Sequence, residues 1–105
     1  MKLKEIPKKP HKGVPEGIHQ MVLFPNGWGL SIISNSEYFY IDEKHPYEIA
    51  VIVSEDPISE IIINPEDQYE YRIDYTYTDG DVIGHLTEEE VDKWLEKVEK
   101  FDPIN

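Results

Sequence analysis

Hydrophobic residues gather in short runs along this chain, and the first two runs are spaced as a β-hairpin. Met21–Phe24 and Leu30–Ser34 are strand-like segments that flank a stretch rich in glycine. That stretch contains Asn26-Gly27, a dipeptide that favours two-residue hairpin turns because both central positions need positive φ. We therefore predict an antiparallel hairpin, with Gly29 at a bulge or at a close backbone contact.

Three further runs predict strands. Tyr47–Val53 is continuously apolar in its middle, as in a central strand that is covered on both faces, and Ile58–Ile63 is a shorter candidate. From Tyr69 to Tyr77 large apolar or aromatic residues alternate with polar ones, which predicts an amphipathic strand that ends in the turn Thr78–Asp81. Its tyrosines either present a binding surface or pack beneath a helix, and we expect the second for at least half of them.

The C-terminal segment has the pattern of an amphipathic helix. Thr87–Glu90 is a capping box, in which the threonine hydroxyl and the glutamate carboxylate each accept a free backbone N–H. The apolar residues that follow fall on one stripe: Val91, Trp94, Leu95, Val98 and Phe101. Strands followed by one helix indicate an α+β domain, here an antiparallel sheet of four to five strands with the helix packed on one face.

The length of 105 residues suits one domain, which we assign to residues 18–105. Residues 1–17 contain three prolines, five lysines and little that could be buried, which predicts a flexible basic arm. No apolar run reaches the roughly 18–20 residues of a membrane span, and no apolar segment of a secretory signal follows the basic start. The absence of cysteine excludes disulfides and zinc–thiolate sites and is compatible with a reducing, intracellular environment.

The charge is strongly negative and unevenly distributed. The formal net charge is −12, and the segment from Glu37 to Asp92 holds 17 acids against two cations, Lys44 and Arg72. Such a body repels phosphate, so we expect no direct nucleic acid binding by it. Its partners would be basic protein surfaces or cations, unless the charge serves solubility alone.

Candidate catalytic chemistry is sparse. The histidines (His11, His19, His45 and His85) lack the helical spacing of a metal pair. Asp79-Gly80-Asp81 begins like a calcium loop but lacks the ligands that should follow. We therefore predict no catalytic residue, no metal ligand and no cofactor, and enzymatic activity is disfavoured. A small hydrolase or ligand-binding domain that uses His85, Asp79 and Asp81 is the alternative.

Three stretches are similar, in the same order, to an uncharacterised family of small proteins encoded in tailed-phage and prophage genomes. Phe24–Ile33, Tyr47–Ile52 and Asp81–Val91 carry its patterns F-x-N-G-aromatic-G-x-S, Y-E-x-A-V and D-V-I-G-x-L-T-x-x-E-V. The match spans most of residues 20–100 and consists of turns, strands and a helix cap. The resemblance implies a phage origin and transfers no site residue.

These observations favour a non-enzymatic phage accessory protein in the host cytoplasm. It would bind a basic surface of a host or phage protein, as an acidic inhibitor or a mimic of nucleic acid. The expected binding residues are Glu70 and Asp74, on an open sheet face, and Asp79 and Asp81, in the acidic turn beside that face. A structural or assembly role in the virion is a further alternative, and the sequence does not specify the oligomeric state.

Overall fold

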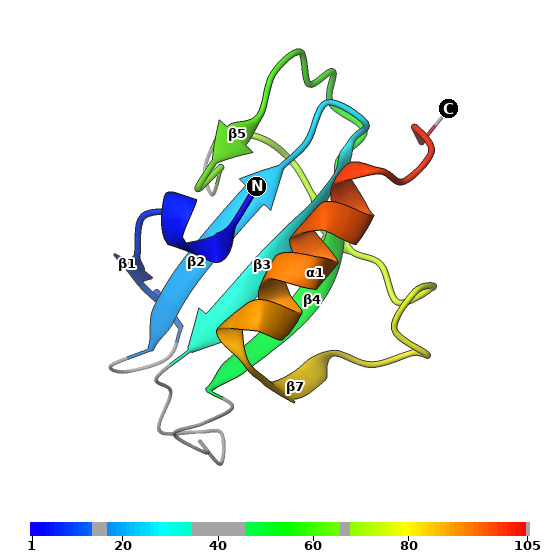
Figure 1. The fold of residues 1–105 in the computed structure, drawn as a ribbon. Coiled ribbons are helices and arrows are strands. Elements are labelled where there is room, and N and C mark those ends of the chain that lie inside the picture. Colours follow the sequence, from blue (N-terminus) through cyan, green and yellow to red (C-terminus); the bar gives the residue numbers. More distant parts are fainter. Residues whose placement is uncertain (14–16, 35–45, 66–67, 105) are drawn as a thin grey trace.

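An antiparallel sheet with one C-terminal helix packed on it forms the fold, which confirms the predicted α+β class (Figure 1). The computed structural model describes residues 1–13, 17–34, 46–65 and 68–104. The elements in these ranges are η1 (Leu3–Glu5), β1 (Lys9–Pro10), β2 (Ile18–Leu23), β3 (Trp28–Ser34), β4 (Tyr47–Val53), β5 (Ile62–Ile63), β6 (Arg72–Ile73), β7 (Ile83–Leu86) and α1 (Glu88–Glu99).

Three long strands, β2, β3 and β4, form the centre of the sheet, and shorter strands pair with its two edges. β1 and β5 both pair with β2, while β6 and β7 pair with opposite ends of β4. The described residues thus form seven strands where four to five were expected, because each edge is built from two short pieces. The central position predicted for Tyr47–Val53 is confirmed, whereas the run Ile58–Ile63 forms a strand only at its last two residues.

The β2–β3 hairpin forms as predicted, but its turn differs from the expected two-residue type. Gly27 N–H donates to Phe24 C=O at 2.9 Å, and Phe24 N–H donates to Trp28 C=O at 2.8 Å. Gly27 alone of the Asn26-Gly27 pair has a positive φ, of 87°. The connection is therefore a three-residue loop that begins with a proline and ends with a left-handed glycine.

The prediction of a close backbone contact at Gly29 is confirmed. A Cβ added there would overlap the backbone carbonyl of Val22, and the β2–β3 register runs through the position without a bulge. A side chain at Gly29 would therefore force the two strands apart.

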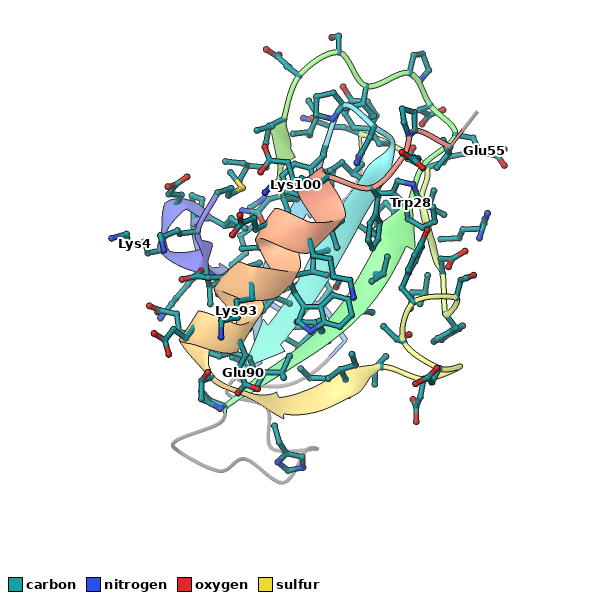
Figure 2. The ribbon with its side chains drawn as sticks, turned by 45° about the vertical axis from the view of Figure 1, so that its right-hand side comes forward. Lys4, Trp28, Glu55, Glu90, Lys93 and Lys100 are labelled. Atoms are coloured by element: carbon teal, nitrogen blue, oxygen red, sulfur yellow. The ribbon has the colours of Figure 1, made fainter. Side chains whose placement is uncertain are left out.

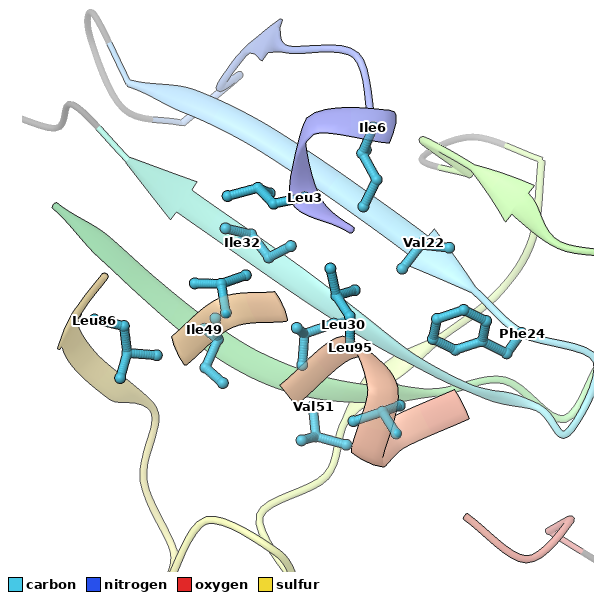
Figure 3. Close-up of a cluster of buried hydrophobic side chains, with 12 residues drawn as sticks. Leu3, Ile6, Val22, Phe24, Leu30, Ile32, Ile49, Val51, Leu86 and Leu95 are labelled. Atoms are coloured by element: carbon cyan, nitrogen blue, oxygen red, sulfur yellow. The ribbon is translucent and has the colours of Figure 1, made fainter. Parts of the chain in front are cut away.

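One face of the sheet packs against α1 and contains the larger core. Val91, Leu95 and Val98 of the helix are fully buried against residues of β3 and β4 (Figure 3). The capping box is confirmed: Glu90 N–H donates to Thr87 Oγ1 at 3.1 Å, and Thr87 N–H donates to Glu90 Oε1 at 3.0 Å. Trp94 is partly buried and packs against the margin of this core.

The first residues contribute to the same core, so the expectation that they contain little that could be buried is wrong. Leu3 and Ile6 are each 2% exposed and lie in the helix-side cluster (Figure 3). The side-chain amide of Gln20 donates to both of their backbone carbonyls, and Leu3 N–H donates to Asp92 at 2.7 Å. These contacts attach η1 to β2 and to α1. Residues 14–16 of the predicted arm lie outside the described residues.

The predicted tyrosine strand is also wrong. Only Arg72–Ile73 is a strand, and the chain then leaves the edge of β4 in a series of turns before returning as β7. Tyr69 and Tyr71 pack on the sheet face opposite α1. Tyr77 is still 44% exposed but stacks on Phe101, with ring centroids 4.1 Å apart. The ladder is therefore divided between the two faces and does not line the helix.

Candidate binding site

The sheet face opposite α1 is only half covered, and its open half forms a groove of about 400 Å³. A second buried cluster covers the other half, centred on Met21, Leu23, Ile52 and Ile58. Ser31 and Ala50 lie opposite each other in the β3–β4 register and form part of the groove lining. Their small side chains leave the floor low, so the hollow follows from the sequence of two adjacent strands.

Hydrogen-bond donors gather at the β1–β2 end of this open-face groove. His19 Nε2 and Ser31 Oγ are 2.7 Å apart, and the His11 ring lies over His19 with centroids separated by 4.9 Å. Gly13 N–H donates to His11 Nδ1 at 3.0 Å, which places the proton of a neutral His11 ring on Nε2. Lys12 also lines the groove at this end.

A carboxylate occupies the opposite end. Glu48 lines the groove, and burial raises its pKa above the ordinary value. The negative charge of Asp81 raises the pKa of Glu48 further, and His85 opposes these effects. The fold therefore disfavours the charged form of Glu48. A cation bound beside the carboxylate would stabilise that charged form.

An irregular strand pairing brings His85 towards Glu48. Tyr47 pairs with Leu86 and Ile49 pairs with Ile83, so two residues of β7 lie opposite the single residue Glu48. His85 takes a φ of 58° in this bulge, which is unusual for a residue other than glycine. The sequence singled out His85 and Asp81, but not the glutamate that they influence.

The remaining predicted binding residues do not form the expected flat acidic face. Asp79 and Gly80 have φ values of 54° and 83°, and Asp81 N–H donates to Thr78 C=O at 3.2 Å, the features of a type I′ turn. The predicted turn is confirmed, but it projects from the edge of the sheet.

Glu70 and Asp74 lie in stretches of the chain that local hydrogen bonds hold in place. Glu70 N–H donates to the carboxylate of Asp56 at 2.9 Å. Asp74 lies 3.4 Å from Arg72 and accepts the backbone N–H of Thr76 at 2.9 Å, and its side chain is only 15% exposed. Burial raises the pKa of Asp74, but the hydrogen bonds from Thr76 and the charge of Arg72 lower it below its ordinary value. This side chain therefore organises the local backbone.

A second, wider hollow lies between the hairpin tip and the C-terminal segment, near Trp28 and Glu55 (Figure 2). Its best-placed polar groups hold the chain together. The Asn26 side-chain amide donates to the carbonyls of Val98 and Phe101 at 3.0 Å each, and Trp28 Nε1 donates to the Asp102 carbonyl at 3.0 Å. These bonds fix the end of α1 on the hairpin, so this hollow is a less suitable binding site.

The chemistry of the open-face groove suits binding better than catalysis. Acyl transfer from the Ser31–His19 pair would need N–H donors aimed at an oxyanion. Ser31 lies inside β3, whose register with both neighbouring strands is continuous, so the adjacent backbone N–H groups belong to the sheet. No cluster of three or more potential metal ligands occurs within residues 1–13, 17–34, 46–65 and 68–104.

Sequence reasoning missed the groove, although one signal was present. Glu48 is an acid directly before the apolar core of a central strand. A carboxylate at such a position costs free energy unless it has a partner, which could have marked Glu48 as a candidate functional residue. His19 and Ser31 come from other strands, and only the register shows that they share a face with Glu48.

Comparisons with known proteins identify no relative: no family model, no curated protein and no solved structure matches the chain. In the part of the chain that the structure describes, no helix has the length and apolar character needed to cross a membrane.

Proposed function

We propose that this protein is a non-enzymatic binding protein that engages a basic segment of a partner protein on the open-face groove. The observation that carries the proposal is Glu48, a carboxylate placed among apolar side chains with Asp81 as its electrostatic neighbour. Such an arrangement costs stability in the free protein and becomes favourable when a cation docks beside it.

The overall charge supports the same class of partner. A net charge of −12 attracts cationic proteins from solution and repels the phosphates of nucleic acid. Association should therefore be fast at low salt and slower as salt screens the exposed charges over roughly 10 Å at 0.1 M.

The apolar part of the groove gives the complex an anchor beyond charge. Ile73 is 44% exposed at the edge of the groove, directly opposite the buried Ile52 of β4. An exposed apolar side chain and a carboxylate in the same groove match a segment with arginine or lysine, which combines an aliphatic stem with a charged end.

The sequence resemblance to small tailed-phage proteins supports the wider biological setting. On that basis the partner is a host or phage protein in the host cytoplasm, and the acidic protein acts as an inhibitor, including by imitating nucleic acid. The groove adds a defined contact point to that proposal, since overall charge alone would not distinguish one basic partner from another.

Site-specific photo-crosslinking tests the proposal. A photoreactive phenylalanine analogue replaces Ile73 in one variant and Lys93, on the exposed surface of α1, in another (Figure 2). In a bacterial lysate at low salt, we expect one discrete protein adduct from position 73 and none from position 93. Glu48→Gln should remove the adduct, whereas the control Glu5→Gln, an equal change of charge at an exposed site in η1, should retain it. Equal adducts from both positions, or adducts insensitive to Glu48→Gln, would refute the proposal.

A further inference from the structure

We propose that Asn26-Gly27, at the tip of the β2–β3 hairpin, is a deamidation site at which the chain converts its own asparagine to aspartate or isoaspartate. The hairpin tip and the end of α1 lie side by side (Figure 1), and the contact between them protects this site. Conversion leaves a protein that is irreversibly less stable. The residues involved do not line the open-face groove, so the site is independent of the proposed function.

The chemistry needs only the asparagine, the glycine and water. The backbone nitrogen of Gly27 loses its proton to solvent and forms a bond to the side-chain carbon Cγ of Asn26. The bond from Cγ to Nδ2 breaks, and Nδ2 takes a proton from solvent and leaves as ammonia. Water then opens the cyclic imide at either of its two carbonyls, without any change of oxidation state. Glycine favours the attack, because it has no Cβ to crowd the nitrogen and adopts the widest range of backbone conformations.

In the folded protein, hydrogen bonds hold both nitrogens that must react. Gly27 N–H donates to Phe24 C=O at 2.9 Å, so the attacking nitrogen must first leave the hairpin turn. Asn26 Nδ2, the leaving nitrogen, donates to the carbonyl oxygens of Val98 and Phe101 at 3.0 Å each. The reaction therefore proceeds through an opened state of the hairpin tip, at a rate proportional to the population of that state.

The product cannot restore the contacts of the asparagine. The last carbonyls of a helix lack the regular intrahelical partner, and Asn26 supplies donors to those of Val98 and Glu99 from a neighbouring element. A carboxylate has no N–H, and it would bring a negative charge to the negative end of the helix dipole. Isoaspartate also lengthens the main chain where space is scarce, since a Cβ added at Gly27 would lie 2.9 Å from Ile104. Each conversion therefore weakens the attachment of α1 to the hairpin.

The first experiment follows deamidation of the full-length protein with and without a denaturing concentration of urea. Peptide mapping by mass spectrometry at mildly alkaline pH reports each asparagine separately. We expect conversion of Asn26 in both states, at least about tenfold more slowly in the folded one. Asn64 is an internal control, because Pro65 follows it and has no N–H nitrogen that could attack. Equal rates at Asn26 in the two states would overturn the protection, and an Asn26 that persists in urea would overturn the site.

Trp28→Phe tests whether the C-terminal segment controls access to the site. Trp28 Nε1 donates to the Asp102 carbonyl at 3.0 Å, and its ring meets Phe101 edge-on with centroids 5.5 Å apart. Phenylalanine keeps an aromatic ring but has no such donor, so deamidation of the folded variant should be about threefold or more faster. Thr87→Ala, which removes the cap at the other end of α1, is the control for a general loss of stability. A rate in Trp28→Phe no higher than that in Thr87→Ala would overturn the protecting role of this contact.

Asn26→Asp reproduces one product directly. At neutral pH it should lower the melting temperature by at least about 5 °C, because the helix carbonyls lose their donors. Asn64→Asp is the matched control: it changes the charge equally, keeps the acceptor for Met21 N–H and loses a single donor contact, with Pro7. The difference between Asn26→Asp and the parent protein should shrink at acidic pH, since a protonated carboxyl has one O–H donor. A melting temperature of Asn26→Asp equal to that of the parent protein or of Asn64→Asp would overturn the inference.

Discussion

Replacing Ile6 by alanine should destabilise the fold strongly, although the residue lies in a segment with the composition of a flexible tail. Its side chain is 2% exposed and contacts the core beneath α1 (Figure 3). Ile61 provides a matched control, since the same substitution there removes a side chain that is 40% exposed.

The expected magnitude follows from burial. Truncation of a fully buried isoleucine to alanine costs about 2–5 kcal/mol, through lost apolar burial and the cavity that remains. A domain of this size is stable by about 5–15 kcal/mol, and each kcal/mol lowers the melting temperature by roughly 4–8 °C. We therefore expect Ile6→Ala to melt at least about 10 °C below the parent protein. Ile61→Ala should stay within a few degrees, since surface changes are worth about 0.5 kcal/mol or less.

Thermal and urea unfolding, both followed by far-ultraviolet circular dichroism, measure the two variants side by side. A lower urea midpoint for Ile6→Ala with an unchanged slope would show lost stability without a change of folded-state compactness. If Ile6→Ala has the same melting temperature as Ile61→Ala, residues 1–13 do not belong to the core. The interpretation made from the sequence, a flexible basic arm, is then correct.

Four further substitutions test other parts of the account. Thr87→Ala should cost about 1 kcal/mol of unfolding free energy in urea titrations, because it removes the hydroxyl that caps α1. Gly29→Ala should reduce stability by more than that, or prevent folding, since its Cβ would meet the Val22 carbonyl. Glu48→Gln should raise the melting temperature at neutral pH; because the folded-state pKa of Glu48 is raised, this gain should vanish as pH falls below the ordinary pKa of glutamate. Asp74→Asn should lower stability above the ordinary pKa of aspartate, with the difference disappearing as pH falls through the lowered folded-state pKa. Melting curves at neutral and acidic pH check both carboxylate predictions.

The features that the sequence predicted correctly are those that neighbouring residues determine. The cap at Thr87 and the stripe from Val91 to Val98 are complete within about ten residues, so local rules suffice. The hairpin between β2 and β3 is also local, although Pro25 shifts its turn to a three-residue form. The alternation of apolar and polar residues from Tyr69 to Tyr77 was a weaker predictor of a strand. Only Arg72 and Ile73 pair with β4, and turns then take the chain away from that strand.

The features that sequence reasoning missed depend on contacts between distant residues. Leu3 and Ile6 are two apolar residues among lysines and prolines, and only contacts with Gln20 and Asp92 show that they are fixed. The groove has the same origin. Glu48 shares its face with residues from other strands, and a one-residue change of register would place it on the helix side.

The pKa of the Glu48 side chain, measured by carbon-13 NMR with and without a basic peptide that contains lysine and arginine, tests the central claim most directly. In the free protein, burial and Asp81 hold this pKa above the ordinary value of glutamate. If an ammonium group docks beside Glu48, its positive charge must lower that pKa, and the same peptide must leave the titration of Glu5 unchanged. A Glu48 pKa that the saturating peptide does not change would contradict the account, because no cation would then lie at the recessed carboxylate.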